Sequence, residues 1–323
     1  MKKQLLWALT AFTAVGLAAC GGNDTEEDSN NAGETNEGTE EKAETIEVES
    51  LNGEMVEVPV NPETVLSFDN GVTDSIRAIG GPISGVPKAN NMPDYLSEFE
   101  GDEYEDVGSL FEPNFELINE MQPDVIFISG RASDAYDELS EIAPTVYLAV
   151  DQENFMESFE SNMHVLGDIF DAQDKVDEHL AGIQETIDEV NEKASNSDSN
   201  ALIVSVDEGS VSAFGAGSRF GIIHGELGIE PADDISAENH GETVNFEYID
   251  SVNPDYIFAV DRGASIGNAA TATETLDNDI VDRTNAAQND QIHQLNGEVW
   301  YLSGSGLESV KIIVDEINEY FEG

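Results

Sequence analysis

The sequence predicts an α/β protein with two related lobes, each with a central sheet flanked by helices, joined by a long interlobe helix. An eighteen-residue segment from Asn114 to Arg131 recurs from Asn245 to Arg262, at a constant offset of 131 residues. Nine of the eighteen aligned positions are identical, where average residue usage would give roughly one. Apolar runs also alternate with helical stretches, as in α/β folds. One copy per half favours two related lobes over a short-period solenoid.

The first elements after the N-terminal region are predicted to be a hairpin, a strand and a helix. Residues 46–60 form two β-type runs around Asn52-Gly53, a pair typical of tight hairpin turns. Residues 64–68 form an apolar run that leads into a helix beginning near Gly71. These elements open the first lobe.

The first copy of the repeat contains a predicted buried strand. Residues 125–129 are mostly apolar and end directly at Gly130-Arg131. A second short strand is predicted at 145–149. Because these strands alternate with helical stretches, we expect a parallel or mixed sheet in this lobe.

The middle of the chain is predicted to be helical. Residues 155–170 form one amphipathic stretch, and a second begins at residue 172, in which apolar residues recur at spacings of four and three. These apolar residues are Val176, Leu180, Ile183, Ile187 and Val190. The helix lies between the two copies of the repeat, so we expect it to connect the lobes; a surface helix of the first lobe is the alternative.

The second lobe is predicted to begin with a strand at 201–206 and a short strand near 211–214. The repeated strand follows at 256–260. A late strand is expected at 298–302, and a closing helix at 307–321.

The N-terminal sequence predicts that the protein is exported from the cytoplasm. Lys2 and Lys3 precede an apolar stretch that is too short for a comfortable membrane span. Leu17-Ala18-Ala19-Cys20 follows and resembles the lipobox of bacterial lipoproteins, in which the cysteine is acylated and becomes the first residue of the mature chain. Cys20 is the only cysteine of the chain, so it has no disulfide partner in the chain. An ordinary secretory signal ending near a cysteine is the alternative.

The predicted organisation has five parts. The segment that follows the cysteine is polar and acidic and cannot bury enough apolar surface to fold, so we expect a disordered tether. The parts are a signal peptide at 1–19, a lipid-anchored tether at 20–44, an N-terminal lobe at 45–170, the interlobe helix at 171–198 and a C-terminal lobe at 199–323.

The chain is strongly acidic, with a formal net charge of −56. This charge argues against nucleic acid as a partner. It also makes cations scarce, since the chain has only five arginines: Arg77, Arg131, Arg219, Arg262 and Arg283.

Three of the arginines are candidates for one binding site. Arg131 and Arg262 each follow a predicted buried strand, and ligands of open α/β sheets bind beyond the carboxyl ends of the strands. Arg219 follows the glycine-rich turn at 215–218 and could join them. Guanidinium groups in a cleft indicate an anionic ligand. The alternative is that each arginine pairs with acidic residues on the surface.

The remaining candidates are His240 and Tyr301. His240 lies on a loop before the second repeat, a position that favours a binding role. Tyr301 is placed at the end of the late strand, where core packing is the alternative. The other histidines are interpreted as solvated or structural residues. No phosphate-binding glycine loop, zinc-protease motif or nucleophile elbow is present, and no catalytic constellation stands out.

Several segments together resemble a known family. The chain is similar to the solute-binding lipoproteins of iron–siderophore and vitamin B12 ABC importers, and within them to the branch that binds ferric catecholate siderophores, petrobactin included. The segments that carry the resemblance are Val107-Gly108-Ser109, Ser218-Arg219-Phe220-Gly221, Asn239-His240-Gly241, Val260-Asp261-Arg262 and the run 300–309.

The resemblance implies roles for the candidate residues. That branch uses three cleft arginines, which match Arg131, Arg219 and Arg262. In some members a histidine and a tyrosine complete the iron shell when the siderophore supplies only four donor atoms, and these match His240 and Tyr301.

The resemblance also implies a partner. Members of the family carry one glutamate on each lobe that pairs with arginines of the permease, and Glu116 and Glu247 match these positions. A favourable charge in the first turn of a helix is an alternative role for both.

We therefore expect a non-enzymatic binding protein that captures a ferric siderophore and delivers it to an ABC permease. We expect the protein to be an extracytoplasmic monomer that needs no intrinsic cofactor. Lipid on Cys20, which includes palmitate, should anchor it to the cell membrane. The alternatives are a binding protein for haem or cobalamin and a metalloenzyme on a similar two-lobed frame.

Overall fold

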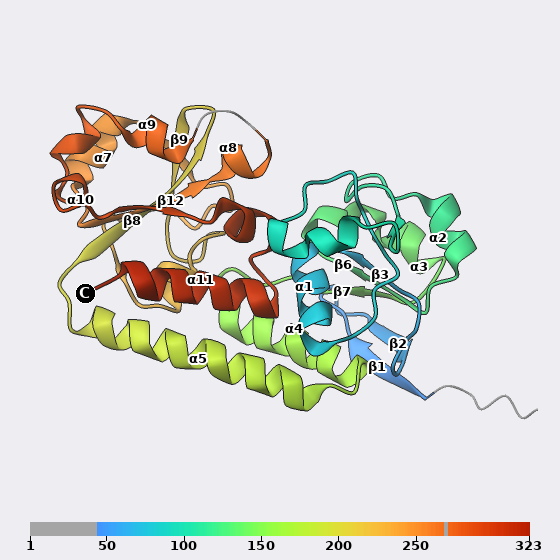
Figure 1. Ribbon diagram of the computed structural model, residues 1–323. Helices are drawn as coiled ribbons and strands as arrows, with labels where there is room; N and C mark the ends of the chain where they lie inside the picture. Colours follow the sequence, from blue (N-terminus) through green and yellow to red (C-terminus); the bar gives the residue numbers. More distant parts are fainter. Residues whose placement is uncertain (1–43, 268–270) are drawn as a thin grey trace, which may run out of the picture. The chain divides into compact units, whose positions relative to one another are not determined.

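The computed structural model describes residues 44–267 and 271–323 (Figure 1). All described residues belong to the second of two units of the chain, Ala43–Gly323, which is compact. The predicted signal peptide, Cys20 and nearly all of the predicted tether lie outside the described residues. Among those that are described, no helix has the length and apolar character needed to cross a membrane.

The second unit begins with the expected hairpin. Strand β1 (Thr45–Glu49) pairs antiparallel with β2 (Met55–Pro59). The turn between them contains Gly53 with a φ of 80°, a left-handed conformation that glycine adopts without steric cost. The Asn52-Gly53 signal therefore predicted this hairpin correctly.

The first sheet is entirely parallel, with the strand order β5-β4-β3-β6-β7. Its central strands β3 and β6 are fully buried, as continuous apolar runs require. The strand bounds are β3 (Val65–Phe68), β4 (Gly85–Val86), β5 (Glu105–Asp106), β6 (Val125–Ile128) and β7 (Thr145–Tyr147). The helices that accompany them are α1 (Asn70–Ile79), η1 (Asp94–Glu100), α2 (Phe115–Met121), η2 (Gly130–Ala135), α3 (Tyr136–Ser140) and α4 (Phe155–Ile169).

The second sheet is mixed, with the order β11-β9-β8-β12-β13 and a short β10 beside β8. Strands β8, β12 and β13 are parallel, whereas β9 runs antiparallel to both β8 and β11. The strand bounds are β8 (Asn200–Asp207), β9 (Ser210–Phe214), β10 (Glu230–Pro231), β11 (Glu242–Val244), β12 (Tyr256–Asp261) and β13 (Ile292–Leu295). The helices are α6 (Ile222–Gly225), α7 (Phe246–Val252), α8 (Arg262–Ser265), α9 (Ala272–Leu276), η3 (Val281–Arg283), α10 (Asn285–Gln288) and α11 (Leu307–Tyr320). The predicted α/β class, with two central sheets flanked by helices, is confirmed.

The two copies of the repeat fold alike. Each begins with an asparagine that caps a helix: Asn114 accepts from the backbone N–H of Leu117 at 3.2 Å, and Asn245 from that of Tyr248 at 2.9 Å. Each helix ends at a residue in the left-handed conformation, Gln122 at φ 49° and Asn253 at φ 51°. The sequence identity therefore corresponds to one helix–turn–strand unit used twice.

The long helix α5 (Gln173–Ser195) is buried along one face, as its apolar spacing predicts. Its apolar stripe belongs to one hydrophobic cluster that also contains Phe127 of β6 and Phe258 of β12. Helix α5 packs against α4 and α11 (Figure 1), and Thr186 donates a hydrogen bond to Asp315 of α11 at 3.1 Å. Residues from both sheets therefore share a core along this helix.

The prediction of a late strand at 298–302 is wrong. Residues Glu298–Ser303 form a π-helical turn, η4, and the strand that pairs with β12 is β13, a few residues earlier. The short apolar run fits either element, since periodicity alone cannot separate a buried strand from a buried turn. Val299, Trp300 and Leu302 are buried within η4, and the Trp300 indole N–H donates to Glu316 at 2.7 Å. Such π-turns occur often at functional sites.

A buried carboxylate holds η4 and α11 against helix α1. Asp74 of α1 accepts from the backbone N–H groups of Glu308 and Ser309 at 2.8 and 2.7 Å, at the start of α11. The Tyr95 hydroxyl donates to Asp74 at 2.9 Å and lies 2.9 Å from the Ser303 hydroxyl. Burial raises the pKa of Asp74 to about 6, although these hydrogen bonds favour its ionised form. The segment that follows Tyr301 is thereby held against α1.

Candidate functional site

Two of the candidate arginines lie at the carboxyl ends of central strands. Arg131 is in η2, directly after β6, and Arg262 is the first residue of α8, directly after β12. Asp261 fixes the start of α8, since its carboxylate accepts from the backbone N–H groups of Ala264 at 2.9 Å and Ala272 at 2.7 Å. The placement of both arginines follows the prediction from the repeat.

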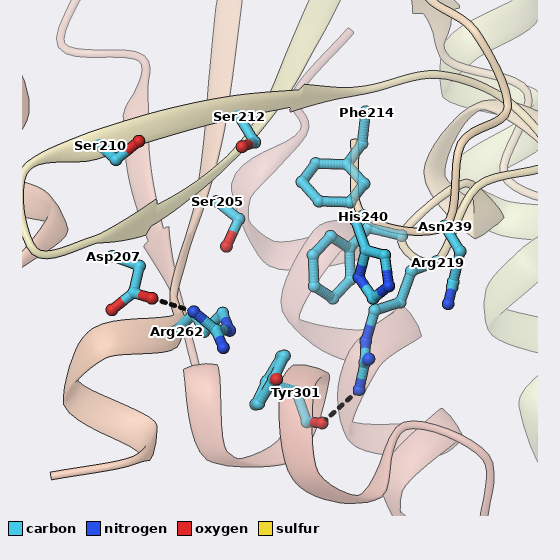
Figure 2. A pocket seen from close by; sticks show the side chains of 11 residues that line it. Ser205, Asp207, Ser210, Ser212, Phe214, Arg219, Asn239, His240, Arg262 and Tyr301 are labelled. Atoms are coloured by element: carbon cyan, nitrogen blue, oxygen red, sulfur yellow. Dashed lines mark hydrogen bonds and ion pairs between the residues drawn. The ribbon is translucent and has the colours of Figure 1, made fainter. Parts of the chain in front are cut away.

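The third arginine reaches the same place from a tight turn. Gly217 has a φ of 73°, and a side chain on Gly221 would meet the backbone nitrogen of Gly217 at 2.7 Å, so both positions need glycine. Phe220 anchors the turn in the core, where its ring lies 4.7 Å from that of Phe214. This anchor leaves the neighbouring Arg219 side chain directed into the pocket (Figure 2).

The three guanidinium groups converge on Tyr301. The Tyr301 carbonyl oxygen accepts from Arg131 Nη2 at 2.8 Å and from Arg219 Nη2 at 2.6 Å. The Cζ atoms of Arg219, Arg262 and Arg131 lie 4.3, 5.2 and 5.4 Å from the centre of the Tyr301 ring. These distances are within the range of cation–π attraction. Tyr301 therefore gathers three like charges around one side chain.

Two of these three arginines have no carboxylate within ion-pair distance among the described residues. Within the described residues, Arg77, Arg262 and Arg283 form ion pairs with carboxylates, whereas Arg131 and Arg219 form none. Burial, and then repulsion by Arg131, lower the pKa of Arg219 to about 10. In a chain with a net charge of −56, two neighbouring arginines without a carboxylate partner among the described residues have donors that can receive an external anion.

The same arginines act on the Tyr301 phenol. Burial opposes its ionisation, but the hydrogen bond and charge of Arg262, together with the charges of Arg219 and Arg131, outweigh burial and lower the pKa of Tyr301. A phenol that loses its proton more readily is a better ligand for a hard cation such as Fe³⁺.

These side chains border a pocket of about 340 Å³ (Figure 2). His240, Arg219, Arg262 and Tyr301 all line it, so the structure brings four of the five predicted binding residues to one cavity. Arg131 is not among the lining residues and joins the site through its contacts with Tyr301. No group of three or more His, Cys, Asp or Glu side chains that could hold a metal ion occurs among the described residues.

The sequence did not point to four further residues of the pocket. They are Ser205, Asp207, Ser210 and Ser212, from β8 and β9. Asp207 forms an ion pair with Arg262. Polar residues at alternate positions are common in half-exposed strands, so the sequence pattern alone gave no reason to place them in a site.

The two candidate docking glutamates lie away from the pocket residues. Glu116 and Glu247 occupy the second position of α2 and α7, and both are exposed. Their equivalent places in the repeat give each a favourable position in the first turn of its helix.

The structural interpretation of His224 is confirmed. Its ring is buried, and Nδ1 lies 2.8 Å from the carbonyl oxygen of Ile229. Burial lowers its pKa, as expected for a neutral core histidine.

Residues 65–299 of the chain match the family described as Periplasmic binding protein. The chain is 41% identical over 326 residues to the petrobactin-binding protein YclQ of Bacillus subtilis, covering 100% of both chains. It is 30% identical to the ferric-anguibactin-binding protein FatB of Vibrio anguillarum, over 79% of this chain and 81% of that protein.

Solved structures show the same fold. The crystal structure of YclQ superposes with a TM-score of 0.83 at 42% identity, over 87% of this chain and 99% of that chain. The catecholate-siderophore-binding protein VctP of Vibrio cholerae superposes with a TM-score of 0.81 at 31% identity, over 85% of this chain and 100% of that chain. The chain therefore belongs to the periplasmic binding protein family.

Proposed function

We propose that this chain is the substrate-binding lipoprotein of an ABC importer, which captures anionic ferric catecholate siderophores and delivers them to the permease. The observation that carries the proposal is the convergence of Arg131 and Arg219, without carboxylate partners among the described residues, on Tyr301 beside Arg262. The similarity to proteins named for petrobactin, ferric anguibactin and catecholate siderophores supports it.

The charge of the cargo fits the charge of the site. A hexadentate tris-catecholate of Fe³⁺ carries three negative charges. Arg131 and Arg219 offer rigid, permanently charged donors without a carboxylate partner among the described residues, and Arg262 adds a guanidinium that it shares with Asp207. The pocket is bordered by serines, arginines, an asparagine and a histidine, with Phe214 and Phe220 on one side. Haem would require a larger apolar surface around an axial ligand, so the mostly polar lining favours an anionic, polar complex.

Tryptophan fluorescence provides the test. The chain has two tryptophans, Trp7 and Trp300, and Trp300 immediately precedes Tyr301 in η4. A protein that starts at residue 21 therefore reports binding through Trp300 alone. We expect saturable quenching by ferric tris-catecholates at submicromolar concentration, and no saturable quenching by haem, cobalamin or a neutral ferric tris-hydroxamate. Tighter binding of haem or cobalamin than of every ferric siderophore would contradict the proposal.

We propose that His240 and Tyr301 complete the iron shell when the siderophore supplies four oxygen donors. Fe³⁺ is then left with two open positions, which an imidazole and a phenolate can fill, and the lowered pKa of Tyr301 favours the phenolate. Tyr301→Phe should remove a visible charge-transfer band from the tetradentate complex, and His240→Ala should weaken that complex about tenfold. Binding of a hexadentate complex should change less than twofold. Unchanged spectra and affinities for both complexes would leave the two residues with a structural role only.

The proposal extends to the organisation of the whole chain. Residues 1–19 form the signal peptide, and Cys20 carries the lipid that anchors the tether, residues 20–44, to the extracytoplasmic face of the membrane. The lobes are residues 45–170 and 199–323, with the interlobe helix at 171–198. The protein acts as a monomer without catalytic activity, and Glu116 and Glu247 contact the permease.

A further inference from the structure

The N-terminus of helix α11 is capped by side chains of another helix. The N-cap residue of α11 is Gly306, which has no side chain that could accept from the first backbone N–H groups of the helix. Helix α1 supplies the acceptors instead (Figure 1): Ser75 accepts from Leu307 at 3.1 Å, and Asp74 accepts from the next two residues. Three N–H groups of α11 therefore depend on a helix that follows β3 of the first sheet.

The two helices meet without room for side chains. A Cβ atom on Gly71 of α1 would lie 2.5 Å from Ser305 Oγ, and one on Gly306 would lie 2.3 Å from the Gly71 carbonyl oxygen. Because only glycine allows the backbone to approach so closely, the start of α11 lies directly against α1. This contact fixes the start of α11 relative to α1.

Helix α1 also holds η4, the segment that contains Tyr301. Asn70 of α1 donates to the carbonyl oxygen of the residue after Tyr301 at 3.2 Å. The Tyr95 hydroxyl lies 2.9 Å from both the Asp74 carboxylate and the Ser303 hydroxyl. These contacts come directly after Tyr301 in the chain, so the place of Tyr301 beside the arginines depends on them.

The charge of Asp74 is costly for the fold. Asp74 is fully buried, and burial raises its pKa from the usual value of 3.8 to about 6, although the hydrogen bonds from α11 and Tyr95 lower it. The other charged groups around it belong to Arg77, which pairs with Glu98 and Glu308. An acid with a raised pKa in the folded state contributes stability that is present below pH 3.8 and is lost as the pH rises through about 6. The ionised carboxylate at neutral pH therefore needs a reason other than stability.

We propose that Asp74 is a positioning residue of the binding site: its ionised carboxylate caps α11 from α1 and thereby holds η4 so that Tyr301 lies among the three arginines. This inference rests on the proposed function, because it assumes that the arginines hold the ferric siderophore. Three donors point at the Asp74 carboxylate, two from α11 and one from Tyr95. A neutral carboxyl group has fewer places to accept, since one of its oxygens carries a proton. Protonation of Asp74 should therefore loosen the start of α11 and, with it, η4.

The test measures the affinity for a synthetic hexadentate ferric tris-catecholate at two pH values, by equilibrium dialysis with radiolabelled iron. At pH 8, Asp74→Asn should bind the complex about tenfold more weakly than the unaltered protein, because an amide cannot accept from all three donors. At pH 5.5 the difference should shrink to about threefold, because Asp74 of the unaltered protein is then largely neutral. Protonation of the ligand affects both proteins equally, so the ratio of their dissociation constants isolates the effect of Asp74.

Thermal unfolding separates this role from a purely structural one. In Asp74→Asn the removal of a buried charge offsets the lost hydrogen bonds, so the unfolding midpoint at pH 8 should stay within about 3 °C of that of the unaltered protein. Tyr95→Phe is the second variant, and it decides the question if Asp74→Asn does not fold. It removes a hydrogen bond that lowers the pKa of Asp74, so the affinity should begin to decline at a higher pH.

Asp124→Asn is the matched control. Asp124 also accepts from two backbone N–H groups of a distant segment, those of Glu63 and Thr64, at 2.9 and 2.8 Å, but it lies at the opposite end of β6 from Arg131. This variant should bind the complex as the unaltered protein does at both pH values.

Two results would overturn the proposal and leave the proposed function intact. One is a ratio of dissociation constants between Asp74→Asn and the unaltered protein that is the same at pH 8 and at pH 5.5. The other is an unchanged pH profile of affinity in Tyr95→Phe. Failure of the unaltered protein to bind the ferric tris-catecholate would instead remove the proposed function and this inference with it.

Discussion

Replacing Arg131 and Arg219 together with alanine should weaken binding of a ferric tris-catecholate by about a thousandfold. Each guanidinium faces the anion without a competing carboxylate among the described residues, and a close charge pair contributes up to about 4 kcal/mol at an effective dielectric constant near 20. Half of that value for each arginine, after solvent screening, corresponds to roughly thirtyfold per residue. Titration of Trp300 fluorescence with the ferric complex measures the loss.

The double variant should still fold, which separates this effect from damage to the structure. Burial, and then repulsion by Arg131, lower the pKa of Arg219, so removal of both arginines relieves a burial cost and a repulsion while it removes two hydrogen bonds to Tyr301. We expect the free energy of unfolding to change by less than about 1 kcal/mol. Arg283→Ala is the control, since Arg283 is exposed and pairs with Asp250. Similar small losses of affinity in Arg283→Ala and in the double variant would contradict the role of the arginines.

Replacing Glu116 and Glu247 together with alanine should abolish iron uptake by cells and leave siderophore affinity unchanged. Both side chains are exposed in the first turn of a helix, at equivalent places of the repeat, and neither forms an ion pair among the described residues. Equivalent acidic positions suit a permease with two related subunits, each with a basic contact. Uptake of a radiolabelled ferric siderophore by a strain that lacks the chromosomal copy measures transport, and the fluorescence titration measures affinity.

The control for docking is Glu120→Ala. Glu120 is exposed on α2 like Glu116, but Ser251 occupies its place in the second copy of the repeat. This variant should transport iron at the normal rate. A large loss of siderophore affinity in the double glutamate variant would show that these residues belong to the binding site. Normal iron uptake by that variant would show that they do not contact the permease.

The repeat explains why much of the fold could be predicted. Asn114 and Asn245 cap helices, and Pro-Asp followed by an apolar run marks a buried parallel strand in each copy. Since such strands end at the binding edge of an α/β sheet, Arg131 and Arg262 could be placed near a ligand from sequence alone. Arg219 was found through the glycines that its turn requires.

Other features of the site depend on tertiary structure. The run from Glu298 to Leu302 fits a strand as well as the π-turn that it forms, and the turn frees the Tyr301 carbonyl to accept from two arginines. Every residue has a backbone carbonyl group, so the residue type at position 301 does not show that its carbonyl oxygen accepts from two arginines. Asp207 is one of many acidic residues in this chain, and only the pairing of β8 with β9 shows that it shares a pocket face with three serines.

The position of the iron atom tests the central claim most directly. Crystals of the protein grown with a ferric tris-catecholate, and measured at the iron absorption edge, locate the metal by its anomalous scattering. We predict one strong peak in the pocket bordered by Arg219, Arg262, His240 and Tyr301, at a position from which the catecholate oxygens can also reach Arg131, whose Cζ atom lies 5.4 Å from the centre of the Tyr301 ring. A single fully occupied iron site elsewhere on the protein, with this pocket empty, would contradict the account.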